Sequence, residues 1–226
     1  MVRSPLILML CLLAGTVARA DEANVTEAQA GAAGAVHALI TAQRGYELAL
    51  KSGDVLLLLA SVRLARGVVL RPPTSWDRAT EGETPEDQPQ GKEAAPDPAS
   101  PTALAILQTF AGEDPGLEDL VYDLDAQLPR SRKPHAISTD AELGVGQTDQ
   151  WRMPLFGSVP AEIGLIGDGD GPLSLTITDE AGLPVCVLPP SAEPGLCAFT
   201  PARNGFFSVT IRNHGVTWTA YRLLAD

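Results

Sequence analysis

The stretch GLIGDGDGPLSLTITDEAG, residues 164–182, decides the fold. Residues 173–178, LSLTIT, alternate apolar and polar side chains, which is the period of a half-buried β-strand. The glycines and aspartates on either side are typical of turns. Asp168 and Asp170 could instead begin a cation-binding loop. The first interpretation predicts a β domain, and the second predicts a metal site.

Segments on both sides of this stretch alternate in the same way. Residues 161–165 and 207–211 carry apolar side chains at every second position, and a final strand is predicted over 216–224. Asn204-Gly205 is a turn signal just before residues 207–211. About seven short strands predict that residues 144–226 form an antiparallel β-sandwich.

The N-terminal half has the period of helices, beginning near Asn24. One apolar face recurs at spacings of three, four and seven: Val36, Leu39, Ile40, Tyr46 and Leu50. Gly53 suits the end of this helix, and Asp54 suits the N-cap of a second helix that extends to Leu70. Residues 21–71 are therefore predicted to form a helical hairpin.

A second helical hairpin is predicted for residues 102–128. Ser100 and Asp114 can each cap a helix that begins with proline, and leucines follow at helical spacing. The two hairpins would pack as a small four-helix unit. The predicted fold class is α+β, with N-terminal α-helical hairpins followed by a C-terminal antiparallel, jelly-roll-like β-sandwich.

Two segments between these parts show neither the helical nor the strand periodicity of apolar residues. Residues 72–101 are rich in proline and acidic residues and nearly free of large apolar ones, so they cannot offset the entropy of ordering. They are predicted to be a disordered insertion. Residues 129–143 begin with a basic cluster and are interpreted as a linker.

Residues 1–20 have the pattern of a secretory signal peptide. Arg3 precedes a short apolar run, and Ala18-Arg19-Ala20 is a cleavage site of the A-x-A type. The run is shorter than the roughly 20 residues that a membrane-spanning helix needs. Cleavage after Ala20 predicts a periplasmic or secreted protein with no membrane span.

The mature chain would be strongly acidic. Without Arg3 and Arg19 it has 14 basic against 28 acidic residues, a formal net charge of −14. Nucleic acids and anionic membrane surfaces attract clustered positive charge, so neither is an expected partner. Solubility is a sufficient reason for this charge, and the oligomeric state stays open.

Cys186 and Cys197 are the two cysteines of the predicted mature chain. In an exported protein, two cysteines this close in sequence predict one disulfide bond, here across the loop PPSAEPG. A metal site is the alternative, but two thiolates without a nearby histidine form a weak ligand set. We expect the disulfide, with a structural role.

Four motifs of the predicted sandwich occur in the order of a known family. They are the glycine-rich turn at 164–171, the Asp-x-x-Gly turn at 179–182, the strand entry Gly205-Phe206, and the last strand at 221–223. Residues 144–226 thus resemble the bacterial pre-peptidase C-terminal domain family. The resemblance implies a jelly-roll-like β-sandwich on a secreted protein.

The same family suggests calcium as a possible ligand. Its members often carry two aspartates in the strand after the glycine-rich turn, and Pro172 and Ser174 occupy those positions here. Asp168, Asp170 and Asp179 are left, whereas Ca²⁺ takes six to eight oxygen ligands. We expect a turn without a cofactor, and calcium at these three aspartates is the alternative.

The chain has no recognisable catalytic constellation. His37, His135 and His214 stand in no metal-binding or triad spacing, and neither a G-x-S-x-G turn nor a glycine-rich phosphate loop is present. We therefore expect no enzyme activity.

Three aromatic residues of the predicted sandwich are candidates for stacking on a ligand: Trp151, Phe206 and Trp218. Exposed rings on a sandwich could bind sugars, as in carbohydrate-binding modules. Alternatively, Trp218 and Phe206 cover the helical part and bury apolar surface between the two halves.

The expected function is that of an exported, non-catalytic accessory or adaptor protein of the bacterial envelope, which binds a protein partner. Residues 46–65 resemble the helix–turn–helix of tetratricopeptide-like repeats, which usually serve as packing or partner surfaces. A carbohydrate- or peptide-binding module is the second hypothesis, and an enzyme of unknown type is the third.

Overall fold

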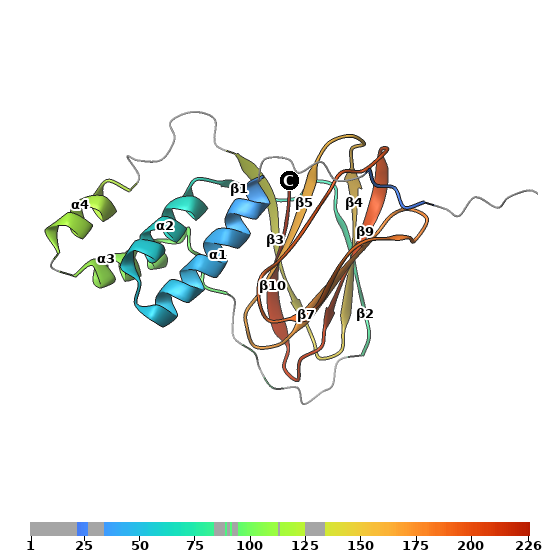
Figure 1. Cartoon of the computed structure of the whole chain (residues 1–226). Helices are drawn as coiled ribbons and strands as arrows, with labels where there is room; N and C mark the ends of the chain where they lie inside the picture. Colours follow the sequence, from blue (N-terminus) through green and yellow to red (C-terminus); the bar gives the residue numbers. More distant parts are fainter. Residues whose placement is uncertain are drawn as a thin grey trace, which may run out of the picture.

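The computed structural model describes residues 22–26, 34–83, 95–112, 114–124 and 134–226, together with residues 89 and 91. Helices lie beside two facing β-sheets (Figure 1), so the predicted α+β fold class is confirmed. The predicted signal peptide, residues 1–20, lies outside the described residues.

The described residues contain four α-helices: α1 Ala35–Ser52, α2 Val55–Arg66, α3 Pro101–Ala111 and α4 Pro115–Tyr122. Gly53 ends α1 in the left-handed conformation (φ 71°), and the Asp54 carboxylate accepts a hydrogen bond from the Leu57 N–H at 3.0 Å. Ser100 and Asp114 cap α3 and α4, each before a proline. These predicted boundaries are confirmed because local capping chemistry sets them. None of these four helices in the described part of the chain is long and apolar enough to cross a membrane.

Successive helices pack against each other, α1 on α2, α2 on α3 and α3 on α4. Each contributes a buried side chain to one core, including Tyr46, Leu58, Leu107 and Val121. Helices α3 and α4, which we call the arm tip, lie farthest from the sheets (Figure 1).

The β part consists of two five-stranded sheets. In order across the first sheet the strands are β1 Val69–Arg71, β3 His135–Leu143, β10 Thr219–Ala225, β5 Ala161–Gly167 and β8 Gly195–Phe199. Across the second they are β2 Asp77–Glu81, β4 Thr148–Leu155, β9 Gly205–Asn213, β6 Leu173–Thr178 and β7 Pro184–Ser191. All pairs are antiparallel except β1 with β3.

The alternation that predicted the sandwich is confirmed in β6 and β9. Leu175 and Ile177 of β6, and Val209 of β9, are fully buried between the sheets. Their polar neighbours in sequence point away from the core, as the period of two requires. The facing apolar sides of the two sheets therefore form the sandwich core.

Three strands lie outside the expected sandwich boundaries. Residues 69–71, predicted to continue the second helix, form β1, because α2 ends at Arg66 and Gly67 is its C-cap. Residues 77–81, expected to be disordered, form β2, and residues 135–143, expected to be a linker, form β3. β2 has no buried residue and owes its place to backbone pairing with β4, which composition does not reveal.

Residues 22–26 also differ from the expectation of a helix beginning near Asn24. Thr26 forms an isolated bridge with Thr200, and Asn24 is fully buried. The Asn24 side chain accepts a hydrogen bond from the Arg203 N–H at 2.9 Å and donates one to the Arg203 carbonyl at 3.1 Å. This segment therefore belongs to the sandwich.

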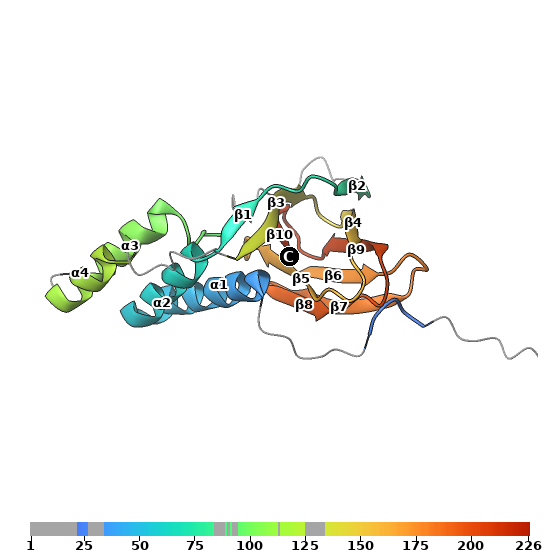
Figure 2. The same ribbon diagram turned by 90° about the horizontal axis from the view of Figure 1, so that it is seen from above.

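Helix α1 joins the helical part to the sandwich (Figure 2). Its N-terminal half packs on the outer face of the first sheet, where Val36 and Ile40 approach Gly164 of β5. A Cβ atom on Gly164 would lie 2.6 Å from Val36 Cγ1, so only glycine permits this approach. The Gly34 N–H donates to the Glu162 carboxylate at 2.9 Å, which satisfies a helix end that lacks a capping side chain of its own.

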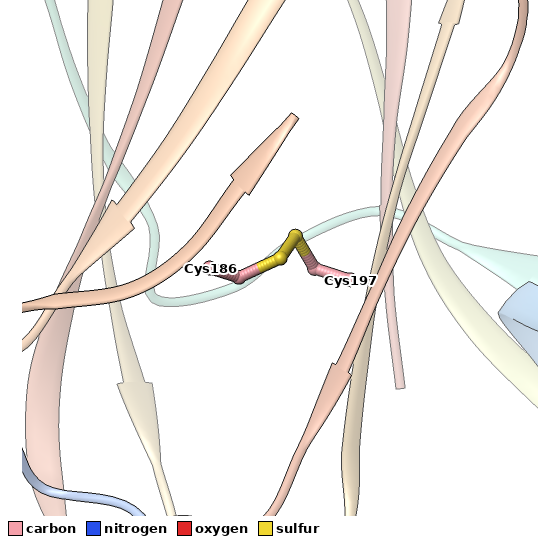
Figure 3. The surroundings of a disulfide bond; sticks show 2 residues. All are labelled: Cys186 and Cys197. Atoms are coloured by element: carbon pink, nitrogen blue, oxygen red, sulfur yellow. A yellow bond between two sulfur atoms is a disulfide. The ribbon is translucent and has the colours of Figure 1, made fainter. Parts of the chain in front are cut away.

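The predicted disulfide between Cys186 and Cys197 is confirmed (Figure 3). Cys186 lies on β7 and Cys197 on β8, with their Cα atoms 6.1 Å apart. β7 is the edge strand of the second sheet and β8 is the edge strand of the first. The bond therefore joins the two sheets at one side of the sandwich.

Candidate functional site

A pocket of about 520 Å³ opens where α1 and β2 meet the outer face of the first sheet. Side chains from five elements line it: Gln43 of α1, Arg78 of β2, Asp140 and Glu142 of β3, Ile166 of β5, and Tyr221 and Arg222 of β10. These elements are distant in sequence, and two of them, β2 and β3, belong to segments that were not expected in the sandwich. The pocket is therefore the first candidate for a binding or catalytic site.

A buried carboxylate, Asp149 of β4, organises one wall of the pocket. It has no exposed surface and lies 2.7 Å from Nη2 of Arg78. The Arg78 Nε–H donates to it at 3.0 Å, and the Thr80 hydroxyl donates at 2.5 Å. Arg78 and Thr80 both come from β2, so this cluster attaches the edge strand to the core.

Tyr221 completes this buried network. Its hydroxyl donates to the Asp149 carboxylate and accepts from the Trp151 indole N–H at 2.7 Å. Burial, followed by the negative charge and hydrogen bond of Asp149, raises the pKa of Tyr221 far above its ordinary value. The phenol therefore stays protonated and is unsuited to act as a base.

Arg222 occupies the opposite wall and is also paired. Its Nε–H donates to Asp140 at 2.7 Å, and Nη1 lies 3.4 Å from Asp97, just before α3. Burial alone would lower the pKa of Arg222, but these carboxylates outweigh it and raise the pKa. Arg222 thus ties β10 to β3 and to the chain that leads into α3.

The charged side chains that line the pocket hold elements of the fold together through ion pairs. Both arginines that line it are bound to carboxylates of the protein itself. A charged ligand would have to break these pairs before it could bind there. The arrangement attaches β2 and the helical part to the sandwich.

The three candidate calcium residues are not brought together. Asp168 precedes β6 and Asp179 follows it, so they lie at opposite ends of one strand. Asp168 accepts hydrogen bonds from the Thr219 hydroxyl at 2.6 Å, the Ala220 N–H at 2.7 Å and the Asp170 N–H at 2.9 Å. Among the described residues, no group of three or more His, Cys, Asp or Glu side chains could hold a metal ion.

Asp179 has a structural role of the same kind. It accepts hydrogen bonds from the N–H groups of Asn24 at 2.8 Å and of Ala181 and Leu183 at 2.9 Å. The last two close the turn after β6, and the first anchors the N-terminal segment. The Gly/Asp turns of the opening stretch therefore connect parts of the sandwich.

Replacing Asp179 with asparagine is expected to reduce the acid sensitivity of the fold. Burial alone would raise the pKa of Asp179, but its three backbone donors and the Arg203 charge outweigh it, so the pKa lies below its usual value. Such a carboxylate stabilises the fold above a pH of about 4, and this stabilisation is lost as the pH falls through the lowered pKa. Denaturant unfolding between pH 7 and pH 3 should show a steeper loss for the wild type than for Asp179→Asn. Parallel curves would contradict this role.

The candidate stacking residues do not form one platform. Trp151 is buried in the core, with its ring edge-on to Trp76 at 6.2 Å between centroids. Phe206 is 45% exposed on the opposite face of the same sheet, where Arg152 lies 3.7 Å over its ring. Trp218 is partly buried just before β10, and its backbone N–H donates to the Pro89 carbonyl at 3.4 Å.

The alternative, that Phe206 and Trp218 cover the helical part, is wrong for Phe206. Phe206 belongs to the second sheet, whereas α1 packs on β3, β5 and β8 of the first. Small and aliphatic residues fill that junction, among them Ala35, Ile166 and Leu224. The aromatic residues of the sandwich therefore do not mark its contact with the helical part.

The arm tip carries a second hollow, of about 380 Å³. It is lined by Gln108 and Ala111 of α3 and by Glu118, Asp119, Val121 and Tyr122 of α4. Tyr122 is 89% exposed. This hollow combines an apolar floor with an acidic rim, and sequence reasoning identified the two helices but not the hollow between them.

The fold and these sites define an α+β protein with a disulfide-bonded β-sandwich and a projecting helical arm. No family model and no curated protein matches the chain. Among solved structures, a crystal structure of CapF with the inhibitor 3-isopropenyl-tropolone matches 50% of this chain at 12% identity and a TM-score of 0.24. This chain spans 37% of that CapF chain. A likeness of this strength carries no argument about function.

Proposed function

We propose that this chain is a non-catalytic accessory or adaptor protein of the bacterial envelope that binds a protein partner through the arm tip. The observation that carries the proposal is the exposure of large apolar side chains there: Phe110 at 37%, Leu120 at 41% and Tyr122 at 89%. Large apolar side chains exposed on two neighbouring helices, here α3 and α4, suit a protein contact surface. The arm tip also lies away from the sandwich (Figure 1), so a partner could reach it without disturbing the sheets.

The envelope location in this proposal is supported by the Cys186–Cys197 bond, because disulfides persist in oxidising compartments. The signal-peptide pattern of residues 1–20 and the likeness of residues 144–226 to pre-peptidase C-terminal domains point the same way. The paired charges of the large pocket support the non-catalytic part. A carbohydrate-binding module has less support, because Trp151 is buried and Arg152 covers the Phe206 ring.

Affinity capture from a periplasmic extract tests the proposal. The wild-type chain should recover one protein in stoichiometric amount, and Tyr122→Ser should recover about tenfold less, because a central tyrosine commonly contributes that much to an interface. Val216→Ser is the matched control, since Val216 is 79% exposed but lies on the sandwich. Equal recovery with Tyr122→Ser, or recovery of glycan without protein, would contradict the proposal.

A further inference from the structure

We propose that the arm tip binds a lysine- or arginine-rich amphipathic segment of its partner, an inference that rests on the proposed function. The first support is charge. Residues 100–124 contain five acidic residues and no lysine, arginine or histidine: Glu113, Asp114, Glu118, Asp119 and Asp123. The charged side chains that α3, α4 and their connecting loop carry are therefore all negative.

The second support is the arrangement of apolar and acidic groups around the hollow. Ala111 and Val121, 4% and 6% exposed, form its floor, whereas Glu118 and Asp119 stand at its rim. Asp114 is already engaged, because its carboxylate caps α4 through the Gly116 N–H at 2.9 Å. Among the described residues, no salt bridge involves Glu118 or Asp119, so both carboxylates can pair with a cationic partner.

The third support is the exposed aromatic ring beside that rim. Tyr122 is the last residue of α4 and is the most exposed of the large apolar residues described. An amphipathic helix buries its apolar face in such a hollow and places its polar face at the edge. Lysine and arginine side chains suit this position, since their stems cover apolar surface while their charges reach the carboxylates.

The same charges disfavour other occupants. A second copy of this chain would bring two acidic tips together, and like charges at an interface are repulsive. An anionic membrane or a nucleic acid would be repelled for the same reason. A basic protein segment is therefore the occupant that this surface fits.

The probe is a synthetic amphipathic helical peptide of leucine and lysine. A matched peptide in which glutamate replaces every lysine is its control. The full chain should bind the lysine peptide, and binding should weaken as salt rises from about 50 to 500 mM, because ion pairs at a rim are screened. The double variant Glu118→Gln with Asp119→Asn should bind it about 5- to 10-fold more weakly. Asp77→Asn with Glu81→Gln removes the same charge from exposed β2 and should change binding by less than about twofold.

Three results would overturn the inference: equal binding of the glutamate peptide, equal losses in the two double variants, or binding that salt does not affect. The salt series needs no variant, so it can still overturn the inference even if the arm-tip variant folds poorly. Capture of a partner that depends on Tyr122 but binds through a segment without basic residues would leave the proposed function standing and reject this inference alone.

Discussion

Replacing Arg78 with alanine is expected to lower the free energy of unfolding by about 3 kcal/mol, the lower end of the range seen when one partner of a buried ion pair is removed, because Asp149 is buried but Arg78 is partly exposed. Asp149 has no exposed surface, and the Arg78 guanidinium is its cationic partner at 2.7 Å. Without that cation the carboxylate remains in the core with only the hydroxyls of Thr80 and Tyr221 as donors. Denaturant unfolding followed by tryptophan fluorescence would measure the loss, because Trp151 borders the network.

Arg152→Ala is the matched control for this prediction. Arg152 lies on β4 but faces outward over the Phe206 ring, so its removal should cost no more than about 1 kcal/mol. Adding Asp149→Asn to Arg78→Ala should restore part of the stability, because a buried amide costs less than a buried unpaired charge. Equal losses for Arg78→Ala and Arg152→Ala would mean that the ion pair does not hold β2 in place.

Replacing both Cys186 and Cys197 with serine is expected to lower the free energy of unfolding by about 3 kcal/mol. The cysteines are 11 residues apart, and the loop-closure model of disulfide stabilisation gives this magnitude for such a loop. The bond also joins edge strands of different sheets, so its loss should allow β7 to separate from β8 first. Thermal and denaturant unfolding of purified protein that begins at Asp21 would measure the effect.

A reductant provides the control for the cysteine variant. Reduced wild-type protein should match the double variant in stability, whereas the reductant should leave the variant unchanged. Alkylation followed by mass spectrometry of the unreduced protein should find neither thiol available. Two alkylatable thiols, or a stability change below about 1 kcal/mol, would contradict the structural role of the bond.

Local chemistry explains which parts of the fold could be predicted. Gly53, Asp54, Ser100 and Asp114 act within one turn of the chain, so their effect on the helix ends can be read from neighbouring residues. The alternation in residues 173–178 is equally local, because one face of the strand is buried and the other is not. These features led to the α+β class.

Strands β2 and β3, which lie outside the expected sandwich boundaries, could not be predicted in the same way. β2 reads as DRATE and is exposed throughout, so its position depends on pairing with β4 and on the reach of Arg78 and Thr80 to a distant carboxylate. β3 does have a weak signal, since Ala141 and Leu143 are buried at alternate positions. The basic cluster just before β3 is typical of a solvated linker, so the composition there does not indicate a strand.

The candidate site was harder to predict than the fold. The pocket combines Gln43, Arg78, Asp140 and Arg222, which come from four separate elements. Asn24 gave no signal of its buried role, because its partners Asp179 and Arg203 lie more than 150 residues away in sequence. Residues that meet only through the tertiary fold leave no pattern in a single sequence.

The most direct test of partner binding through the arm tip is site-specific photo-crosslinking in cells. A photoreactive amino acid is placed at position 122 on the arm tip or at position 216 on the sandwich, both highly exposed at 89% and 79%. The account predicts that position 122 crosslinks to one protein, at a lysine- or arginine-rich segment identified by mass spectrometry, and that position 216 does not. Crosslinks to the same protein from both positions alike, or none from position 122, would contradict it.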